Sequence, residues 1–194
     1  LDLDRVLFHG SDSFLLGPTT APMPAPKRPD YQDLFTAEAG EEWRMETGSW
    51  RVENEFRVSN GAIRTACVHL LPEHGAAELH VAAASEETEA YGIFITGQTL
   101  SICRKANQIR LLDADGATRW KMALPEGFRH DALHCLTLRW DKNSTVHLDH
   151  LLLHGLTLSL PETHIGYFAD GAARFGSVTI SGVTDLLCVC LLYT

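Results

Sequence analysis

The sequence predicts an all-β fold, a sandwich of two antiparallel sheets, and three observations support this prediction. Apolar and polar residues alternate with the period of a strand, as in Leu136-Thr137-Leu138-Arg139-Trp140. Asn60-Gly61 and Asp170-Gly171 separate such runs, and these pairs supply the positive φ angles that tight hairpins need. Helical periodicity is nearly absent, since only residues 72–77 and 85–90 could form a helical turn. Short strands at this spacing are typical of a sandwich or jelly roll.

The first part of the chain differs from the rest. Residues 6–10 and 13–17 each predict a brief strand, and residues 18–29 then contain five prolines. Such a stretch favours an extended polyproline conformation and acts as a semi-rigid linker. We therefore expect the tail of an upstream domain plus a linker over residues 1–29, and the sandwich over residues 30–194. Because the first residue is not Met and the pattern has already begun, we expect a fragment of a longer polypeptide or a processed product.

The strands that follow the linker are of two kinds. Residues 146–149 and 178–180 alternate, so each predicts a strand with one buried face. Residues 91–95 and 108–112 are expected to be buried on both faces. The apolar run at 186–193 has eight residues, and a buried strand explains it.

Length and charge restrict the class of protein. A chain of 194 residues can form one domain, or one domain with an appendage, and can bury a sizeable core. Sixteen basic and twenty-five acidic side chains give a net charge of −9, and no basic stripe is present for a nucleic acid. This balance is compatible with neutral ligands such as sugars. No apolar stretch approaches the twenty residues of a membrane-spanning helix.

The cysteines predict a reduced protein. There are five of them, an odd number scattered through predicted strands, whereas an oxidised framework usually has an even number in a smaller chain. We expect buried free thiols. This favours a cytoplasmic location slightly, and export from a bacterium stays open as the alternative.

The order of the strand motifs resembles that of the concanavalin A-like lectin and glucanase sandwiches. Gly48-Ser49-Trp50-Arg51-Val52 followed by Asn60-Gly61 resembles the first strands of that family, and Tyr91-Gly92-Ile93 opens a run like its central strand. Residues 136–140 and 146–150 resemble a strand pair that ends in Asp-Gly, with His150 in place of the glycine. Gly166-Tyr167-Phe168-Ala169 and Ala173-Arg174-Phe175-Gly176 resemble the closing strands.

This resemblance implies a function through its relatives. Such sandwiches are often appended after the five-bladed propeller of glycoside hydrolases of families 43 and 32, and the first 29 residues look like a propeller tail plus linker. It implies a non-catalytic accessory module with an upstream catalytic domain in the same polypeptide. The parent would act on glycans that contain arabinose, xylose or fructose.

Two histidine clusters are candidates for metal binding. His130 and His134 are four residues apart, but the segment runs into a strand, where that spacing separates them by about 13 Å, too far to share one zinc ion. His147 and Asp149 would share a strand face, so a metal could bridge them, with a solvated face as the simpler interpretation. We expect no metal cofactor.

Asp113 and Asp115 precede Gly116 and could offer oxygen ligands to calcium. The run lacks the downstream Glu of a complete calcium loop, and a hairpin turn explains it without an ion. Because some sandwiches of the family carry a structural calcium, that ion stays as an alternative. No other cofactor is implied.

Catalysis by this chain is not expected. The glucanase branch of the family uses Glu-x-Asp-x-x-Glu on one strand, where two carboxylates lie close together. That motif is absent, and the acidic run Glu86-Glu87-Thr88-Glu89 is typical of a solvated loop.

Two aromatic residues are the candidates for sugar contact. Trp120, between Arg119 and Lys121, is the best candidate for an exposed platform, and Tyr91 is the second. Trp50 and Trp140 are in phase with core positions.

Three functions follow. The first is an accessory module that supports a glycoside hydrolase or its substrate pocket. The second is an independent carbohydrate-binding module, and the third is a glycoside hydrolase active in its own right. No nucleic acid or membrane is expected as a partner.

Overall fold

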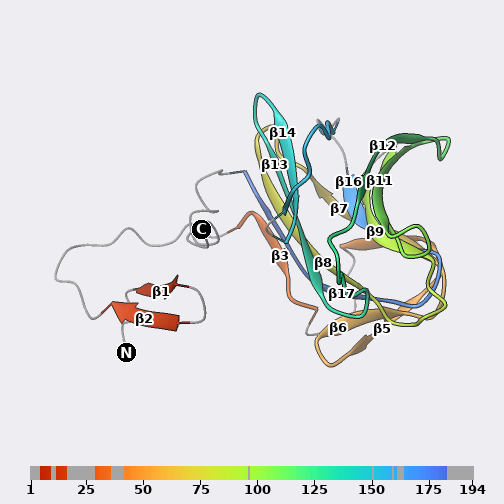
Figure 1. Cartoon of the computed structure of the whole chain (residues 1–194), viewed down its shortest axis with the longest axis horizontal. Coiled ribbons are helices and arrows are strands. Elements are labelled where there is room, and N and C mark those ends of the chain that lie inside the picture. The colour runs from red at the N-terminus through yellow and green to blue at the C-terminus, as the bar shows by residue number, and fades with distance from the viewer. Residues whose placement is uncertain are drawn as a thin grey trace.

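The computed structural model confirms the all-β sandwich. It describes residues 5–9, 12–16, 29–35, 42–95, 97–149, 151–158, 160 and 164–182. Every regular element in these ranges is a strand, and the strands of the sandwich form two antiparallel sheets that face each other (Figure 1). No helix within these ranges is long and apolar enough to cross a membrane.

The first sheet has seven strands in the order β12-β11-β10-β9-β16-β7-β4. Their bounds are β4 (Trp43–Thr47), β7 (Ile63–Leu70), β9 (Ala90–Ile95), β10 (Gln98–Cys103), β11 (Gln108–Asp113), β12 (Thr118–Ala123) and β16 (His164–Ala169).

The second sheet has the order β15-β14-β13-β8-β17-β6-β5, and β3 also pairs with β17. Its strands are β3 (Tyr31–Asp33), β5 (Trp50–Glu53), β6 (Phe56–Ser59), β8 (Gly75–Ala83), β13 (His134–Trp140), β14 (Ser144–Leu148), β15 (Leu151–Leu152) and β17 (Ala173–Ser181).

The two strands predicted at the start of the chain are present. β1 (Arg5–His9) and β2 (Asp12–Leu16) form an antiparallel hairpin, a sheet of its own. The linker over residues 18–28 lies outside the described residues, and so do His150, the apolar run at 186–193 and its two cysteines.

The hydrophobic core lies between the sheets and follows the predicted alternation. In β13, buried and half-buried residues alternate from His134 to Trp140, and β9 is buried on both faces as expected. The prediction that 108–112 is buried on both faces is wrong. β11 turns Ile109 and Leu111 into the core, whereas Gln108, Arg110 and Leu112 remain partly exposed on the opposite face.

A cluster around a buried arginine connects the second sheet to the first. Arg57 on β6 is 1% exposed, and its Nη2 donates to Oδ2 of Asp33 at 2.9 Å. Its guanidinium carbon lies 4.2 Å from the ring centre of Phe35 and 4.5 Å from that of Trp50, so cation–π contacts add to the ion pair. The Trp43 indole also donates to the Asp33 carboxylate, at 2.9 Å. This cluster fixes β6, one of the strands that form the cavity described below.

The prediction of buried free thiols is confirmed only for one cysteine. Cys67, Cys103 and Cys135 are thiols that form no disulfide within the described residues, but only Cys67 is buried, and burial raises the pKa of its thiol. Cys103 and Cys135 are partly exposed because they lie on the strand faces that point away from the core.

Candidate functional site

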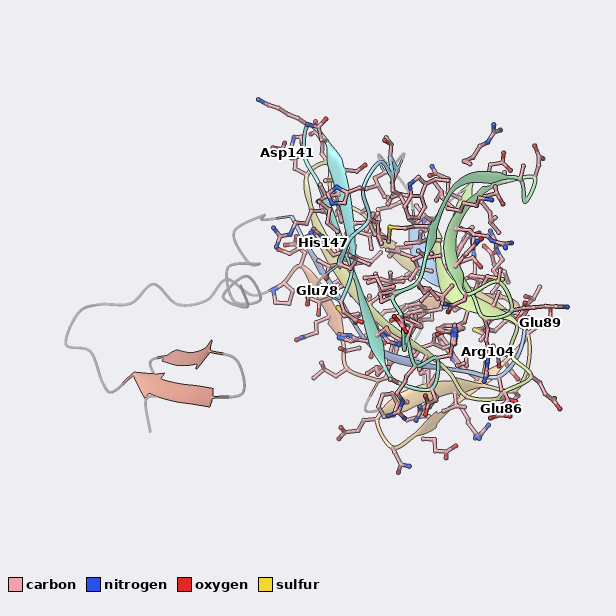
Figure 2. The ribbon with its side chains drawn as sticks, in the orientation of Figure 1. Glu78, Glu86, Glu89, Arg104, Asp141 and His147 are labelled. Carbon is pink, nitrogen blue, oxygen red and sulfur yellow. The ribbon has the colours of Figure 1, made fainter. Side chains whose placement is uncertain are left out.

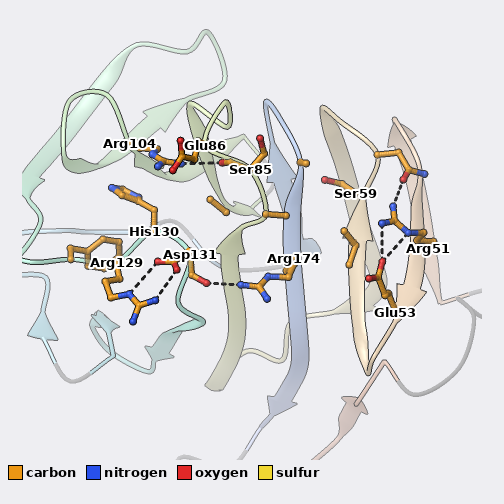
Figure 3. Close-up of a pocket in the computed structure, with 16 residues that line it drawn as sticks. Arg51, Glu53, Ser59, Ser85, Glu86, Arg104, Arg129, His130, Asp131 and Arg174 are labelled. Atoms are coloured by element: carbon orange, nitrogen blue, oxygen red, sulfur yellow. Dashed lines mark hydrogen bonds and ion pairs between the residues drawn. The ribbon is translucent and has the colours of Figure 1, made fainter.

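One end of the sandwich carries a cavity of about 880 Å³. It lies where β6, β8 and β10 end and β17 begins (Figure 3). β5 and β6 form one wall, and the loop residues 84–86 and 128–131 form the other. Segments far apart in the sequence therefore meet at this one place. The volume is within the range of small-molecule sites, about 300–1,000 Å³.

Small buried side chains leave this space open. Ala83 and Ser59 are 3% and 1% exposed, and Ala84 and Ala172 also line the cavity. The Ser59 hydroxyl accepts a hydrogen bond from the Ala173 amide at 2.9 Å, which ties the end of β6 to the beginning of β17. The small side chains of the cavity floor are therefore held in place by a hydrogen bond between a side chain and the backbone.

The strand register places two arginines on one face of the second sheet. Arg51 pairs with Val58, and Val58 pairs with Arg174, so the three residues form one row across β5, β6 and β17. The next residue of β17, Phe175, is buried in the core. Because successive side chains of a strand point to opposite faces, Arg174 points away from the core.

The loop at 128–131 is held from two sides. The Ala83 amide donates to the His130 carbonyl at 2.8 Å, and Nη2 of Arg174 donates to the Asp131 carbonyl. Within the loop, Arg129 pairs with the Asp131 carboxylate at 2.7 Å. This ion pair lowers the pKa of Asp131, so the carboxylate stays ionised.

His134 at the beginning of β13 connects this loop to Asp149 through its two ring nitrogens. Its Nδ1 lies 2.8 Å from Oδ2 of Asp149, and its Nε2 lies 2.8 Å from the Arg129 carbonyl oxygen. Both partners accept hydrogen bonds, so both nitrogens must carry protons and the ring is an imidazolium. Burial lowers the pKa of His134, but the bonds to Asp149 and Arg129 outweigh burial and raise it above its ordinary value. The Phe128 ring stacks on His134, with 3.9 Å between the ring centres.

His130, in contrast, has a lowered pKa. Burial lowers its pKa, and the positive charge of Arg104 lowers it further. The Tyr91 hydroxyl lies 3.1 Å from its Nδ1. The pKa values of these two nearby histidines are therefore shifted in opposite directions.

The expectation that Tyr91 is an exposed sugar platform is wrong. It is 0% exposed, because β9 is a central strand of the first sheet with both faces covered. Burial raises the pKa of its hydroxyl. Tyr91 does not line the cavity, but its hydroxyl contacts His130, which does.

Trp120 lies away from the cavity lining. It is on β12, half-buried against the core, and its Nε1 donates to the His154 carbonyl at 3.1 Å. Its expected exposure as a platform is therefore only partial. A role for Trp120 in ligand contact stays a prediction.

The structure does not bring the predicted metal residues together. His147 lies on β14, whereas Asp149 follows that strand with a φ of 53° and faces His134 instead. His147 is also not among the residues that line the cavity, and Figure 2 shows it on a different part of the sandwich from Arg104 and Glu86. The described part of the chain contains no group of three His, Cys, Asp or Glu side chains that could hold a metal ion.

The Asp113 carboxylate stabilises the predicted turn between β11 and β12. Its Oδ1 accepts hydrogen bonds from the amides of Ala117 and Asp115, and its Oδ2 pairs with Arg119. The backbone bond from Ala117 is the main reason that the pKa of Asp113 is lowered. Calcium at Asp113 and Asp115 stays a prediction.

Sequence reasoning missed the cavity. Its arginines come from β5, from the residue after β10, from the loop at 128–131 and from β17, and no local motif connects them. The one available signal was the position of Arg174 beside Phe175 in an alternating strand, which places a charge on the outer face.

No family model matches the sequence, and no curated protein matches it. Solved structures do share the fold. The carbohydrate-binding module CBM66 from Bacillus subtilis has a TM-score of 0.57 and 13% identity, over 72% of this chain and 95% of that one. A protein of unknown function with a galectin-like fold, also from Bacillus subtilis, has a TM-score of 0.61 and 12% identity, over 82% and 98%.

An endo-β-galactosidase from Clostridium perfringens, which releases GlcNAcα1-4Gal, has a TM-score of 0.57 and 10% identity. The match covers 84% of this chain but only 64% of that enzyme. At these identities the similarity shows the fold alone, a lectin-like β-sandwich.

Proposed function

We propose that this chain is a non-catalytic carbohydrate-binding module, appended to a glycoside hydrolase, and that the cavity at the end of the sandwich is its binding site. The observation that carries the proposal is the cavity itself, about 880 Å³ with a fixed floor of small side chains and a polar rim. Sites of this size bind small molecules, and a few fixed polar groups orient them. The fold is shared with a module that binds carbohydrate, which supports this choice of ligand.

The chemistry of the rim suits a sugar. Arg104, Arg174 and Ser85 offer donors and acceptors for hydroxyl groups, and the Phe128 ring offers an apolar face. Phe128 is held by its stacking on His134, so little freedom would be lost on binding. These features favour recognition over a purely supporting role for the sandwich.

The same rim argues against hydrolysis. A glycosidase needs one carboxylic acid with a raised pKa to protonate the leaving group. Asp131 has a lowered pKa because Arg129 pairs with it, and Glu53 is paired with Arg51 at 2.8 Å. The catalytic step would then belong to the upstream domain that the linker at 18–29 predicts. The sequence of the parent gene tests whether such a domain is encoded in the same reading frame.

Filling the cavity tests the binding site. Ala84 is exposed and lines the cavity, so Ala84→Trp should occupy it without removing a structural hydrogen bond of a side chain. Ala114→Trp, at the exposed turn between β11 and β12, is the matched control. Calorimetry against xylan, arabinan, fructan, galactan and acidic oligosaccharides should give saturable binding to the wild type and to the control, and none to Ala84→Trp. The proposal would be contradicted if the folded wild-type protein bound no saccharide of this panel. It would also be contradicted if Ala84→Trp bound a saccharide as tightly as the wild type does.

A further inference from the structure

The four arginines of the cavity differ in how their charges are balanced. Arg51 pairs with Glu53 and Arg129 pairs with Asp131. Arg104 and Arg174 form no ion pair with a carboxylate within the described ranges, and their bonds go to backbone carbonyls (Figure 3).

The two unbalanced guanidinium groups are fixed in place. Nη1 of Arg104 donates to the Ser85 carbonyl at 3.0 Å, and Nη2 of Arg174 donates to the Asp131 carbonyl. A carbonyl oxygen does not neutralise a positive charge, so each bond orients the fork while leaving the charge available. An arginine that is already oriented loses less side-chain freedom when it binds an anion.

The remaining charges do not cancel these two. Burial and the nearby Arg104 lower the pKa of His130, which disfavours a positive charge on its ring. Glu86 is the one cavity carboxylate without an ion pair in the described structure, and it offsets one of the two arginines. The cavity is therefore net positive, in a chain whose net charge is −9.

We propose that the cavity binds an anionic saccharide, whose carboxylate or sulfate group is bound by Arg174 and Arg104. This inference rests on the proposed carbohydrate-binding function and specifies its ligand. Guanidinium forks match planar carboxylates and bind other oxyanions by charge-assisted hydrogen bonds. A neutral sugar would leave the net positive charge of the cavity unbalanced, whereas an acidic sugar would complete the charge balance of the site.

The test compares charged saccharides with their neutral counterparts. Glucuronate-substituted xylo-oligosaccharide and plain xylo-oligosaccharide form one pair, and sulfated and unsulfated galacto-oligosaccharide form the other. Each is titrated into the full chain by calorimetry at low and high NaCl. We expect at least one charged member to bind about tenfold or more tightly than its partner, since charge-assisted hydrogen bonds are worth about that much. Its advantage should shrink at high salt. The two pairs distinguish a carboxylate from a sulfate.

Substitutions assign the effect to the two arginines. Arg174→Gln and Arg104→Gln should each remove most of the advantage of the charged ligand over its neutral partner, and should weaken neutral binding less, because Gln keeps a hydrogen-bond donor but not the charge. Arg174→Lys, which keeps the charge but loses the fork, should fall between wild type and Arg174→Gln. Arg44→Gln, at an exposed position on β4, is the matched control and should bind as wild type does. Thermal melts confirm that each variant is folded.

The outcomes separate the two proposals. Equal affinity for charged and neutral members, independent of salt, would overturn the anionic ligand and leave carbohydrate binding intact. An equal loss of both ligands in the Gln variants would likewise overturn it. If no saccharide binds the folded wild type, the proposed function itself is refuted, and this inference with it.

Discussion

Replacing Asp149 with Asn should convert His134 from an imidazolium to a neutral ring without breaking the fold. The Asp149 carboxylate accepts from the Cys135 amide through Oδ1 and from His134 through Oδ2, each at 2.8 Å. In Asp149→Asn, the amide oxygen can keep the Cys135 bond while its NH₂ group donates to Nδ1 of His134. That nitrogen must then be unprotonated, and Nε2 still donates to Arg129. Asn also tolerates the φ of 53° at this position.

The cost follows from the exposure of the pair. A hydrogen bond between charged groups contributes about 1.5–3 kcal/mol. His134 is buried, but the Asp149 side chain is 44% exposed, so solvent screening places the value at the lower end, about 1.5 kcal/mol. The pKa of His134 is raised in the folded state. Its contribution is therefore fully present below the unfolded pKa, about 6.5, and is lost as pH rises through the folded pKa.

The assay is urea unfolding of wild type and Asp149→Asn across pH 5 to 9. The difference in the free energy of unfolding should be about 1.5 kcal/mol near pH 5.5 and should fall to zero or below at high pH. NMR titration should show a lower pKa for His134 in the variant. The charges of Asp131 and His130 also affect the pKa of His134. Both residues are present in wild type and variant, so their effects cancel in the comparison. A difference that does not depend on pH, or an unchanged His134 pKa, would refute the imidazolium.

Three further predictions concern the core and the sequence-based site. Asp33→Asn should lower the free energy of unfolding by about 3 kcal/mol in a urea melt, because it leaves the buried guanidinium of Arg57 without its counter-charge, and a loss below about 1 kcal/mol would contradict this. Gly166→Ala should cost at least about 3 kcal/mol, because a Cβ would lie 1.7 Å from the Thr65 carbonyl oxygen, and a wild-type melting temperature would show this approach to be wrong. Trp120→Ala should leave saccharide affinity unchanged in calorimetry, because Trp120 does not line the cavity, and a lost affinity would instead support its predicted role as a platform.

Local patterns predicted most of the fold. The alternation in 136–140 and the apolar run in 91–95 correctly gave β13 one buried face and β9 two. The same reasoning failed for β11, because Leu112 is apolar but lies on the strand face that points away from the core. Alternation with a period of two shows which residues share a strand face. It does not show which of the two faces the other sheet covers.

The site was not predictable because it is a product of long-range pairing. Arg51 and Arg174 come to lie in one row, on either side of Val58, only through the registers of β5, β6 and β17. The pair of His134 with Asp149 depends in the same way on the β13–β14 hairpin. Tyr91 was a candidate for the surface because aromatic residues suit sugars, but burial in a central strand decides its position.

A crystal structure of the full chain with the tightest-binding saccharide of the panel tests the central claim most directly. We predict electron density for the sugar in the cavity, against Arg174 and the loop at 128–131, with its anionic group at the arginines. A saccharide bound elsewhere, such as against Trp120 on β12, with the cavity empty would contradict the assignment of the site.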